Sequence, residues 1–347
     1  MNNTERKIVI TGYSAITAAG TGITPLQELL SRGASALTSV PVESADGQQL
    51  MWGHASHFKA ADFMPPLKAR KLDRSSQIAT ATAGLAIREA GIDVKNLNPE
   101  RIGIAMGCGF GGIGNSAEFL TGFFNSGAEG MTPLLFPNTV SNASASNASI
   151  EHGLKGPNVT MVQRFCSAES ALLMACRFIE QGRADIMLAG GIDELNPLMI
   201  KGFIDLGQHK SLASCFGEGC GIIVLESAES ADRRGVPVRA RLTEIRTVGL
   251  MPAGMEEEGR LRLTGDCHGI SRAGFSGTAD LMPSLTGLFA EDRRQSIAPV
   301  VGRSLAMGAT ALATLIASTG PDEKAIHLAA SPEGPYFSIC FHGGTSA

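Results

Sequence analysis

Short apolar runs that end in glycine turns, each followed by a helical stretch, constrain the fold of this chain more than any other feature. Residues 101–107 (RIGIAMG) run into the turn CGFGG, and residues 184–194 (ADIMLAGGIDE) form a second such run. A third glycine turn feeds the run at 216–227 (FGEGCGIIVLES). Apolar runs of this length are typical of strands buried on both faces, and their alternation with helices predicts an α/β fold.

Two segments share the same strand–turn–helix pattern, at 158–182 and at 298–318. Both helices are lined with Ala and Gly and can approach another helix closely. This similarity indicates an internal duplication, and we expect one α/β body with two pseudo-equivalent halves. Further strands are expected at 7–16 and 236–247, and further helices at 22–33 and 75–91.

Composition excludes several classes of protein. The 347 residues are 44% hydrophobic with a net charge of −4, so neither nucleic acid nor a membrane surface is an expected partner. No stretch reaches the roughly 20 apolar residues that span a bilayer, and the N-terminus runs directly into a strand, which favours a cytoplasmic protein. The seven cysteines show no CxxC pair and no zinc-like spacing with histidine, so we expect reduced thiols and no metal site.

Five motifs in order carry a family resemblance: VITGYSAITAAG, GCGFGG, PLLFPNTVSNASAS, GRADIMLAGGIDE and FGEGCGIIVLE. Together they resemble the β-ketoacyl-ACP synthase family of thiolase-fold condensing enzymes, and they cover residues 7–226. The resemblance implies a layered α-β-α-β-α arrangement of two pseudo-equivalent βαβαβ halves. We place these halves at 1–212 and 213–347 and expect the second to be shortened.

The resemblance also locates the family's nucleophile, a cysteine that opens a helix after a strand. A helix N-terminus lowers the pKa of such a thiol. Counting forward from Gly156-Pro157 and backward from Gly182 places Phe165 at this position, and phenylalanine cannot attack a thioester. Cys166 follows one residue later. Because one helical step turns a side chain by about 100°, we expect Cys166 to be a buried thiol that points away from the pocket.

The family's other catalytic positions are degenerate as well. The first histidine, from an H-G-T-x-T motif, is matched by His268, and the 268-to-305 interval agrees with the family's spacing. The second histidine position is occupied by Leu305 and the lysine position by Val300. Neither side chain can donate to a developing enolate, so His268 is expected to be a structural remnant. The last motif, F-G-F-G-G-T-N, is matched to CFHGGT at 340–345.

A ketosynthase framework without its catalytic groups resembles the chain length factor of type II polyketide or aryl-polyene systems. That resemblance implies a heterodimer with an active ketosynthase. It also implies an acyl carrier protein whose phosphopantetheine arm delivers the substrate, and no cofactor bound to this chain. Phe110 occupies the family's tunnel-gating position, and Phe165 is a candidate plug of the vestigial pocket. For Phe119, Phe123 and Phe124, ordinary core packing is favoured over a gating role.

Three alternatives remain open from the sequence. Gly107, Gly109 and Gly112 spell the G-x-G-x-x-G of a dinucleotide-binding oxidoreductase, although no acidic residue follows convincingly about 20 residues later. The chain is alternatively an active condensing enzyme that uses Cys166 and His268. The third alternative is a homodimeric scaffold without chemistry.

Overall fold

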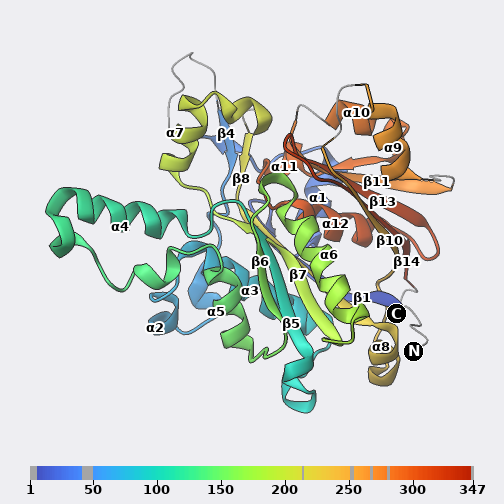
Figure 1. The fold of residues 1–347 in the computed structure, drawn as a ribbon, viewed down its shortest axis with the longest axis horizontal. Helices are drawn as coiled ribbons and strands as arrows, with labels where there is room; N and C mark the ends of the chain where they lie inside the picture. Colours follow the sequence, from blue (N-terminus) through green and yellow to red (C-terminus); the bar gives the residue numbers. More distant parts are fainter. Residues whose placement is uncertain are drawn as a thin grey trace.

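Most of the strands form one large mixed sheet that runs through the molecule (Figure 1). The structure is a computed structural model, which describes residues 6–40, 50–212, 215–250, 254–265, 269–279 and 282–344. Within these ranges the large sheet has eleven strands in the order β12-β11-β13-β14-β10-β1-β9-β7-β5-β6, with β2 paired to β1. Its strands are β1 Ile8–Thr17, β2 Gly20–Thr21, β5 Ile102–Cys108, β6 Asn158–Met161, β7 Ile186–Asp193, β9 Gly219–Ser227, β10 Ala240–Val248, β11 Ile270–Gly277, β12 Arg294–Ser296, β13 Lys324–Ala330 and β14 Tyr336–Gly343.

The sheet consists of two halves with the same internal strand order. Numbered along the chain, the strands of each half lie in the order third, second, fourth, fifth, first, as β6-β5-β7-β9-β1 and as β12-β11-β13-β14-β10. In each half the second strand pairs in parallel with the third and fourth, and the remaining pairs are antiparallel. The first strands, β1 and β10, join the halves. The expected duplication is therefore confirmed at the level of topology.

This symmetry bears on the position of the boundary between the halves. Strand β9, Gly219–Ser227, lies between β1 and β7 and completes the first half. The strand order thus favours a boundary after Ser227, whereas the sequence placed it between 212 and 213. A separate small sheet, β3-β4-β8, is formed by Thr38–Ser39, Met51–Gly53 and Cys215–Gly217.

Helices complete the predicted five layers. Helices α3 and α5 cover one face of the first half, where Ile104 and Ile222 point, while the next residues, Ala105 and Ile223, face α6 and α12 on the other side. Helices α6 and α12 contact each other and fill the middle layer, and α9 and α10 cover the outer face of the second half. These helices are α3 Arg74–Glu89, α5 Ala143–His152, α6 Ser167–Glu180, α9 Glu256–Thr264, α10 Met282–Thr286 and α12 Gly308–Ser318.

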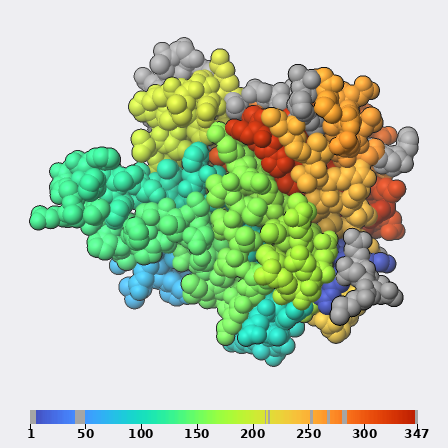
Figure 2. Space-filling view, viewed as in Figure 1, coloured from blue at the N-terminus to red at the C-terminus, as the bar shows by residue number. Residues whose placement is uncertain are grey.

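Residues 113–140, which we call the α4 arm, stand away from this body (Figures 1 and 2). Helix α4, Ile113–Ser126, has no buried residue. Phe123 and Phe124 are 45% and 78% exposed, and Phe119 is only partly buried. The expectation that these three phenylalanines pack in the core is wrong. The remaining helices are α1 Thr24–Arg32, α2 Pro66–Ala69, α7 Pro197–Asp205, α8 Ala228–Arg234 and α11 Ala298–Val301.

Candidate functional site

Phe165 lies in the short segment between the end of β6 and the start of α6, and its ring is almost fully buried. Only 1% of the residue is exposed, and it belongs to a hydrophobic cluster that includes Phe203, Phe216 and Leu305. The structure thus brings together the two positions at which the family pattern expects a cysteine and a histidine. Both are filled by hydrocarbon, which offers neither a nucleophile nor a proton donor.

Val300 lies apart from this cluster. It is in α11 and packs with Leu26, Ile297 and Met307 in a second cluster. The position assigned to the catalytic lysine is therefore part of ordinary core packing.

Cys166 faces away from Phe165, as the helical rotation predicts. Its Sγ donates to the Pro335 carbonyl oxygen at 3.2 Å, and the side chain packs with Ala329 and Phe337 from the second half of the sheet. Burial, aided by the negative charge of Glu169, raises the pKa of the thiol well above its usual value. The thiol is held protonated, the opposite of what a helix-N-terminal nucleophile requires.

His268 lies outside the described residues, and the structure suggests a different match for its motif. Strand β11 begins at Ile270 and ends at Gly277, and Thr278 follows. Gly277-Thr278 fit the G-T of the H-G-T-x-T pattern, so we infer that Ser276 stands at the histidine position. The assignment of His268 itself stays a prediction.

Ser276 belongs to a buried polar triad that the sequence analysis missed. Its Oγ donates to Glu169 Oε1 at 2.5 Å, and His327 Nε2 lies 2.9 Å from the same carboxylate oxygen and 3.1 Å from the serine oxygen. All three side chains are buried. The triad joins α6, β11 and β13 at the centre of the molecule. The signal in the sequence is Glu169, an acidic residue in the first turn of the alanine-rich helix α6 that the fold buries completely.

The C-terminal match to the family's glycine turn is wrong. Cys340 to Gly343 continue strand β14 and pair with β10, so CFHGGT begins in regular sheet. The turn that reaches the α6 N-terminus is the one between β13 and β14, where Pro335 accepts the Cys166 hydrogen bond.

Phe110 stands at the edge of the Phe165 cluster, half exposed. Its ring meets Phe203 edge-to-face with centroids 5.9 Å apart. The buried carboxylate of Asp193 fixes the surrounding backbone, because it accepts from Gly109 N at 2.7 Å and from Ala306 N at 2.8 Å. Burial raises the pKa of Asp193 to about 6. Asp193 therefore holds the backbone of Gly109 and Ala306, the neighbours of Phe110 and Leu305, in place.

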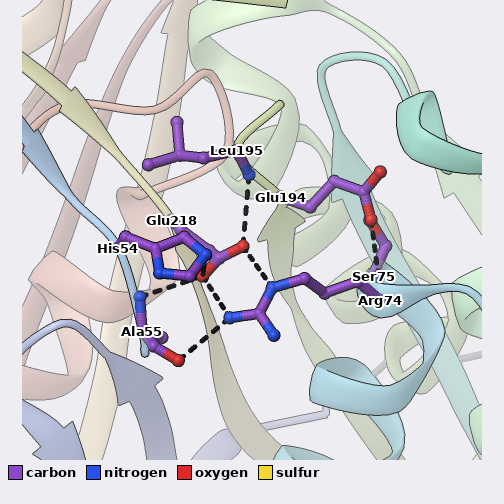
Figure 3. A network of polar contacts seen from close by, with 7 residues as sticks. All are labelled: His54, Ala55, Arg74, Ser75, Glu194, Leu195 and Glu218. Atoms are coloured by element: carbon purple, nitrogen blue, oxygen red, sulfur yellow. Dashed lines mark hydrogen bonds and ion pairs between the residues drawn. The ribbon is translucent and has the colours of Figure 1, made fainter. Parts of the chain in front are cut away.

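Two further buried carboxylates anchor the neighbouring elements (Figure 3). Glu218, from the FGEGCG motif, accepts from Arg74 Nε and Nη2 at 2.7 and 2.6 Å and from Ala55 N at 2.9 Å. Glu194 accepts from Ser75 N at 2.9 Å, in the first turn of α3, and from Gly114 N at 2.6 Å, in the first turn of α4. A single carboxylate therefore caps two helices, one of which is the base of the α4 arm.

This arrangement does not fit a dinucleotide. In a dinucleotide-binding unit the helix N-terminus after the glycine turn binds pyrophosphate. Here the Glu194 carboxylate occupies the N-terminus of α4. A β carbon at Gly107 would lie 2.2 Å from the Ser167 backbone, so this glycine accommodates α6 and not a ligand.

Across the described ranges, no group of three or more His, Cys, Asp or Glu side chains is arranged to hold a metal ion. In the same residues, no helix combines the length and apolar character needed to cross a bilayer.

The layered fold and the position of Phe165 after β6 define a thiolase-like ketosynthase architecture. The family model for the N-terminal domain of β-ketoacyl synthases matches residues 5–231, and the chain belongs to this family. It is 28% identical over 259 residues to 3-oxoacyl-[acyl-carrier-protein] synthase 2 of Vibrio cholerae, an alignment that covers 69% of this chain and 62% of the relative. The corresponding Staphylococcus aureus (strain N315) enzyme is 25% identical over 261 residues, or 70% and 63% of the two chains. The alignments thus span less than two thirds of these relatives.

Solved structures share the fold over nearly the whole chain. A type II polyketide synthase acyl-carrier protein in complex with its ketosynthase bound to the hexaketide gives a TM-score of 0.80 at 19% identity, covering 98% of this chain and 100% of the other. The ishigamide ketosynthase/chain length factor gives 0.77 at 21% identity, covering 97% and 99%. A β-ketoacyl synthase from Burkholderia phymatum STM815 gives 0.79 at 21% identity, covering 97% and 99%.

Proposed function

We propose that this chain is a non-catalytic ketosynthase subunit, a chain length factor that pairs with an active ketosynthase. The observation that carries the proposal is the burial of Phe165 and Leu305 in one hydrocarbon cluster, at the two positions where the family pattern expects the nucleophile and a histidine. The neighbouring thiol of Cys166 points elsewhere and is held protonated. Condensation would then take place in the partner, on acyl and malonyl groups carried by the phosphopantetheine arm of an acyl carrier protein.

The surface around β6 supports a partner subunit. Strand β6 is the edge of the sheet, and Val162 just after it is 52% exposed. The α4 arm presents Leu120, Phe124 and Phe136, residues that are 50%, 78% and 60% exposed. An open strand edge and exposed apolar surface of this extent are both typical of protein–protein interfaces.

Co-expression with candidate ketosynthases from the same genome tests the pairing. We expect a stable equimolar complex, because the arm and the strand edge would be covered by the partner. A Phe124→Ser, Phe136→Ser variant should lose the complex, whereas Leu261→Ser, which replaces an apolar residue 63% exposed on α9, should keep it. A stable homodimer that never exchanges with the ketosynthase would contradict the proposal and favour the scaffold alternative.

Incubation with an acyl-loaded carrier protein, followed by intact mass, tests the inactive state. We expect no covalent adduct on this chain. An acyl adduct that disappears in Cys166→Ala would overturn the proposal in favour of an active enzyme. In the complex, Phe110→Ala should shift the products toward longer chains, because the half-exposed ring of Phe110 is proposed to close the acyl tunnel. Products of unchanged length would show that Phe110 does not gate the tunnel.

A further inference from the structure

A groove with a volume of about 540 Å³ opens between β1, the start of α1 and the end of α3. This volume is within the range of small-molecule sites in proteins. Most of the side chains that line the groove are polar, and they include Tyr13, Ser14, Thr24, Gln27, Arg88 and Glu89. The groove shares no residue with the Phe165 cluster, so a molecule bound in it would leave the vestigial catalytic positions untouched.

The groove follows an open edge of the large sheet. Strand β1 pairs with β10 at residues 9–10 and with β2 at residues 16–17, and among the described residues no strand pairs with this edge between them. Tyr13 and Ser14 lie in this interval, and both line the groove. Because successive side chains of a strand point to opposite faces of the sheet, the groove reaches both residues only by running along the strand edge.

Ser14 is the strongest sign that the groove takes a ligand. The residue is only 4% exposed, yet its hydroxyl has no hydrogen-bond partner among the residues that the structure describes. A hydroxyl removed from water without a partner costs free energy, and a molecule in the groove would supply the missing partner. The hydroxyl of Tyr13 likewise has no described partner. Burial, together with the nearby carboxylate of Glu89, raises the pKa of Tyr13, so this hydroxyl remains a donor.

The start of α1 provides a position for an anion. Helix α1 begins at Thr24, no side chain caps its N-terminus, and its first turn contains no acidic residue. The partial positive charge of a helix N-terminus favours phosphate groups, and Thr24 adds hydroxyl and N–H donors at the wall of the groove. Arg88 of α3 also lines the groove, is exposed, and has no ion-pair partner in the described part of the chain.

The remaining polar side chains of the groove fit hydroxyl groups. Glu89 is paired with Arg239 at 2.9 Å, which compensates its charge but leaves lone pairs of the carboxylate for further donors. Gln27 donates through Nε2 to Ser318 Oγ at 3.4 Å, and its amide oxygen is a second acceptor. A bare phosphate would leave these acceptors unused, whereas a molecule that also carries hydroxyl groups would bind to them.

We propose that this groove binds a small phosphorylated polyol, such as a sugar phosphate, without forming a covalent bond. The phosphate would accept from Thr24 and Arg88 at the start of α1. The hydroxyl groups of the polyol would form hydrogen bonds with Ser14, Tyr13 and Glu89. The inference goes beyond the proposed pairing with a ketosynthase, because the isolated full chain contains the whole groove.

Titration calorimetry of the isolated full chain with glucose 6-phosphate, ribose 5-phosphate and glycerol 3-phosphate tests the site. We expect at least one of these compounds to bind saturably to one site, with inorganic phosphate and glucose each at least about tenfold weaker, because each lacks one of the two recognised groups. Ser14→Ala should weaken binding roughly fivefold to tenfold, the loss of one hydrogen bond. Arg88→Gln should weaken it roughly tenfold or more, whereas Arg32→Gln, which removes an exposed charge at the other end of α1, should leave the affinity unchanged.

A further variant places a carboxylate at the position of the phosphate. An acidic residue is favoured in the first turn of a helix, so Thr24→Glu should unfold at the same temperature as the wild type or higher, and it should abolish binding by repelling the phosphate. The proposal is overturned if none of the three compounds binds saturably, if inorganic phosphate or glucose binds as tightly as they do, or if Ser14→Ala, Arg88→Gln and Thr24→Glu all leave the affinity unchanged. None of these results depends on whether a ketosynthase pairs with this chain.

Discussion

Phe165 and Leu305, far apart in the sequence, are buried in one hydrophobic cluster, and the two residues are only 1% and 4% exposed. In the family pattern these two positions hold the nucleophile and a histidine that assists it. In this chain the same backbone positions are brought together, but their side chains pack as core residues. The shared cluster predicts that Phe165 and Leu305 contribute to the stability of the fold.

Phe165→Ala should destabilise the chain by about 3–5 kcal/mol, because it leaves a cavity in a cluster that cannot fully collapse. Phe110→Ala is the matched control: the same ring is lost at a position that is 43% exposed, and the cost should be about 1 kcal/mol or less. Urea unfolding followed by circular dichroism measures both. Equal effects of the two substitutions would contradict the assignment of Phe165 as a core residue.

The thiol of Cys166 should react slowly in the folded protein. Burial and the charge of Glu169 raise its pKa, so little thiolate is present at mildly alkaline pH. Brief treatment with iodoacetamide and peptide mapping should label Cys340, which is partly exposed, before Cys166. After unfolding in urea both should react alike. Preferential labelling of Cys166 in the native protein would indicate an activated thiol.

The topology was predictable from the sequence because its signals are local. Apolar runs, glycine turns and alanine-rich helices each depend on a few neighbouring residues, and the structure confirms the layered fold and the two matching halves. The direction of Cys166 followed in the same way from one step of helical rotation. The sequence is therefore sufficient to predict those features of the fold that depend on local geometry.

The remainder of the site depends on contacts that sequence spacing does not encode. The match of His268 rests on an interval between motifs, and it stays a prediction because His268 lies outside the described residues. The triad of Glu169, Ser276 and His327 joins three elements that only the folded sheet brings together. The phenylalanines of the α4 arm are residues of a type that is usually buried in a core. Only the structure shows that this chain alone does not bury them.

Glu194 predicts a dependence of stability on pH. Burial is the main cause that raises its pKa from 4.5 to about 7, and Asp73 adds to the rise, while hydrogen bonds from Gly114 and Ser75 oppose it. Between pH 4.5 and about 7 the folded protein binds more protons at this site than the unfolded chain, so stability falls as pH rises through this window. The loss from this group is on the order of 3 kcal/mol.

Chemical unfolding at several pH values tests this dependence in Glu194→Gln, which cannot titrate. As pH rises from 4.5 to about 7, the free energy of unfolding should fall less in the variant than in the wild type. Glu257→Gln, at an exposed position in α9, should follow the wild type. If the free energy of unfolding changed with pH in the same way for wild type and Glu194→Gln, another group would govern the dependence between pH 4.5 and about 7.

Gly308 should tolerate no side chain, because it lies directly against the buried triad. A β carbon added there would stand 1.9 Å from Glu169 Oε1, inside the helix layer between the two halves of the sheet. We expect Gly308→Ala to cost about 1–3 kcal/mol or more, since either α12 or the carboxylate must move. Gly202→Ala is the matched control in α7, where a β carbon meets nothing within 4 Å, and it should stabilise the chain by about 0.5–1 kcal/mol through helix propensity. Thermal unfolding of the two variants measures both effects on stability. A Gly308→Ala variant as stable as the wild type would mean that the Glu169 carboxylate is free to leave its position between Ser276 and His327.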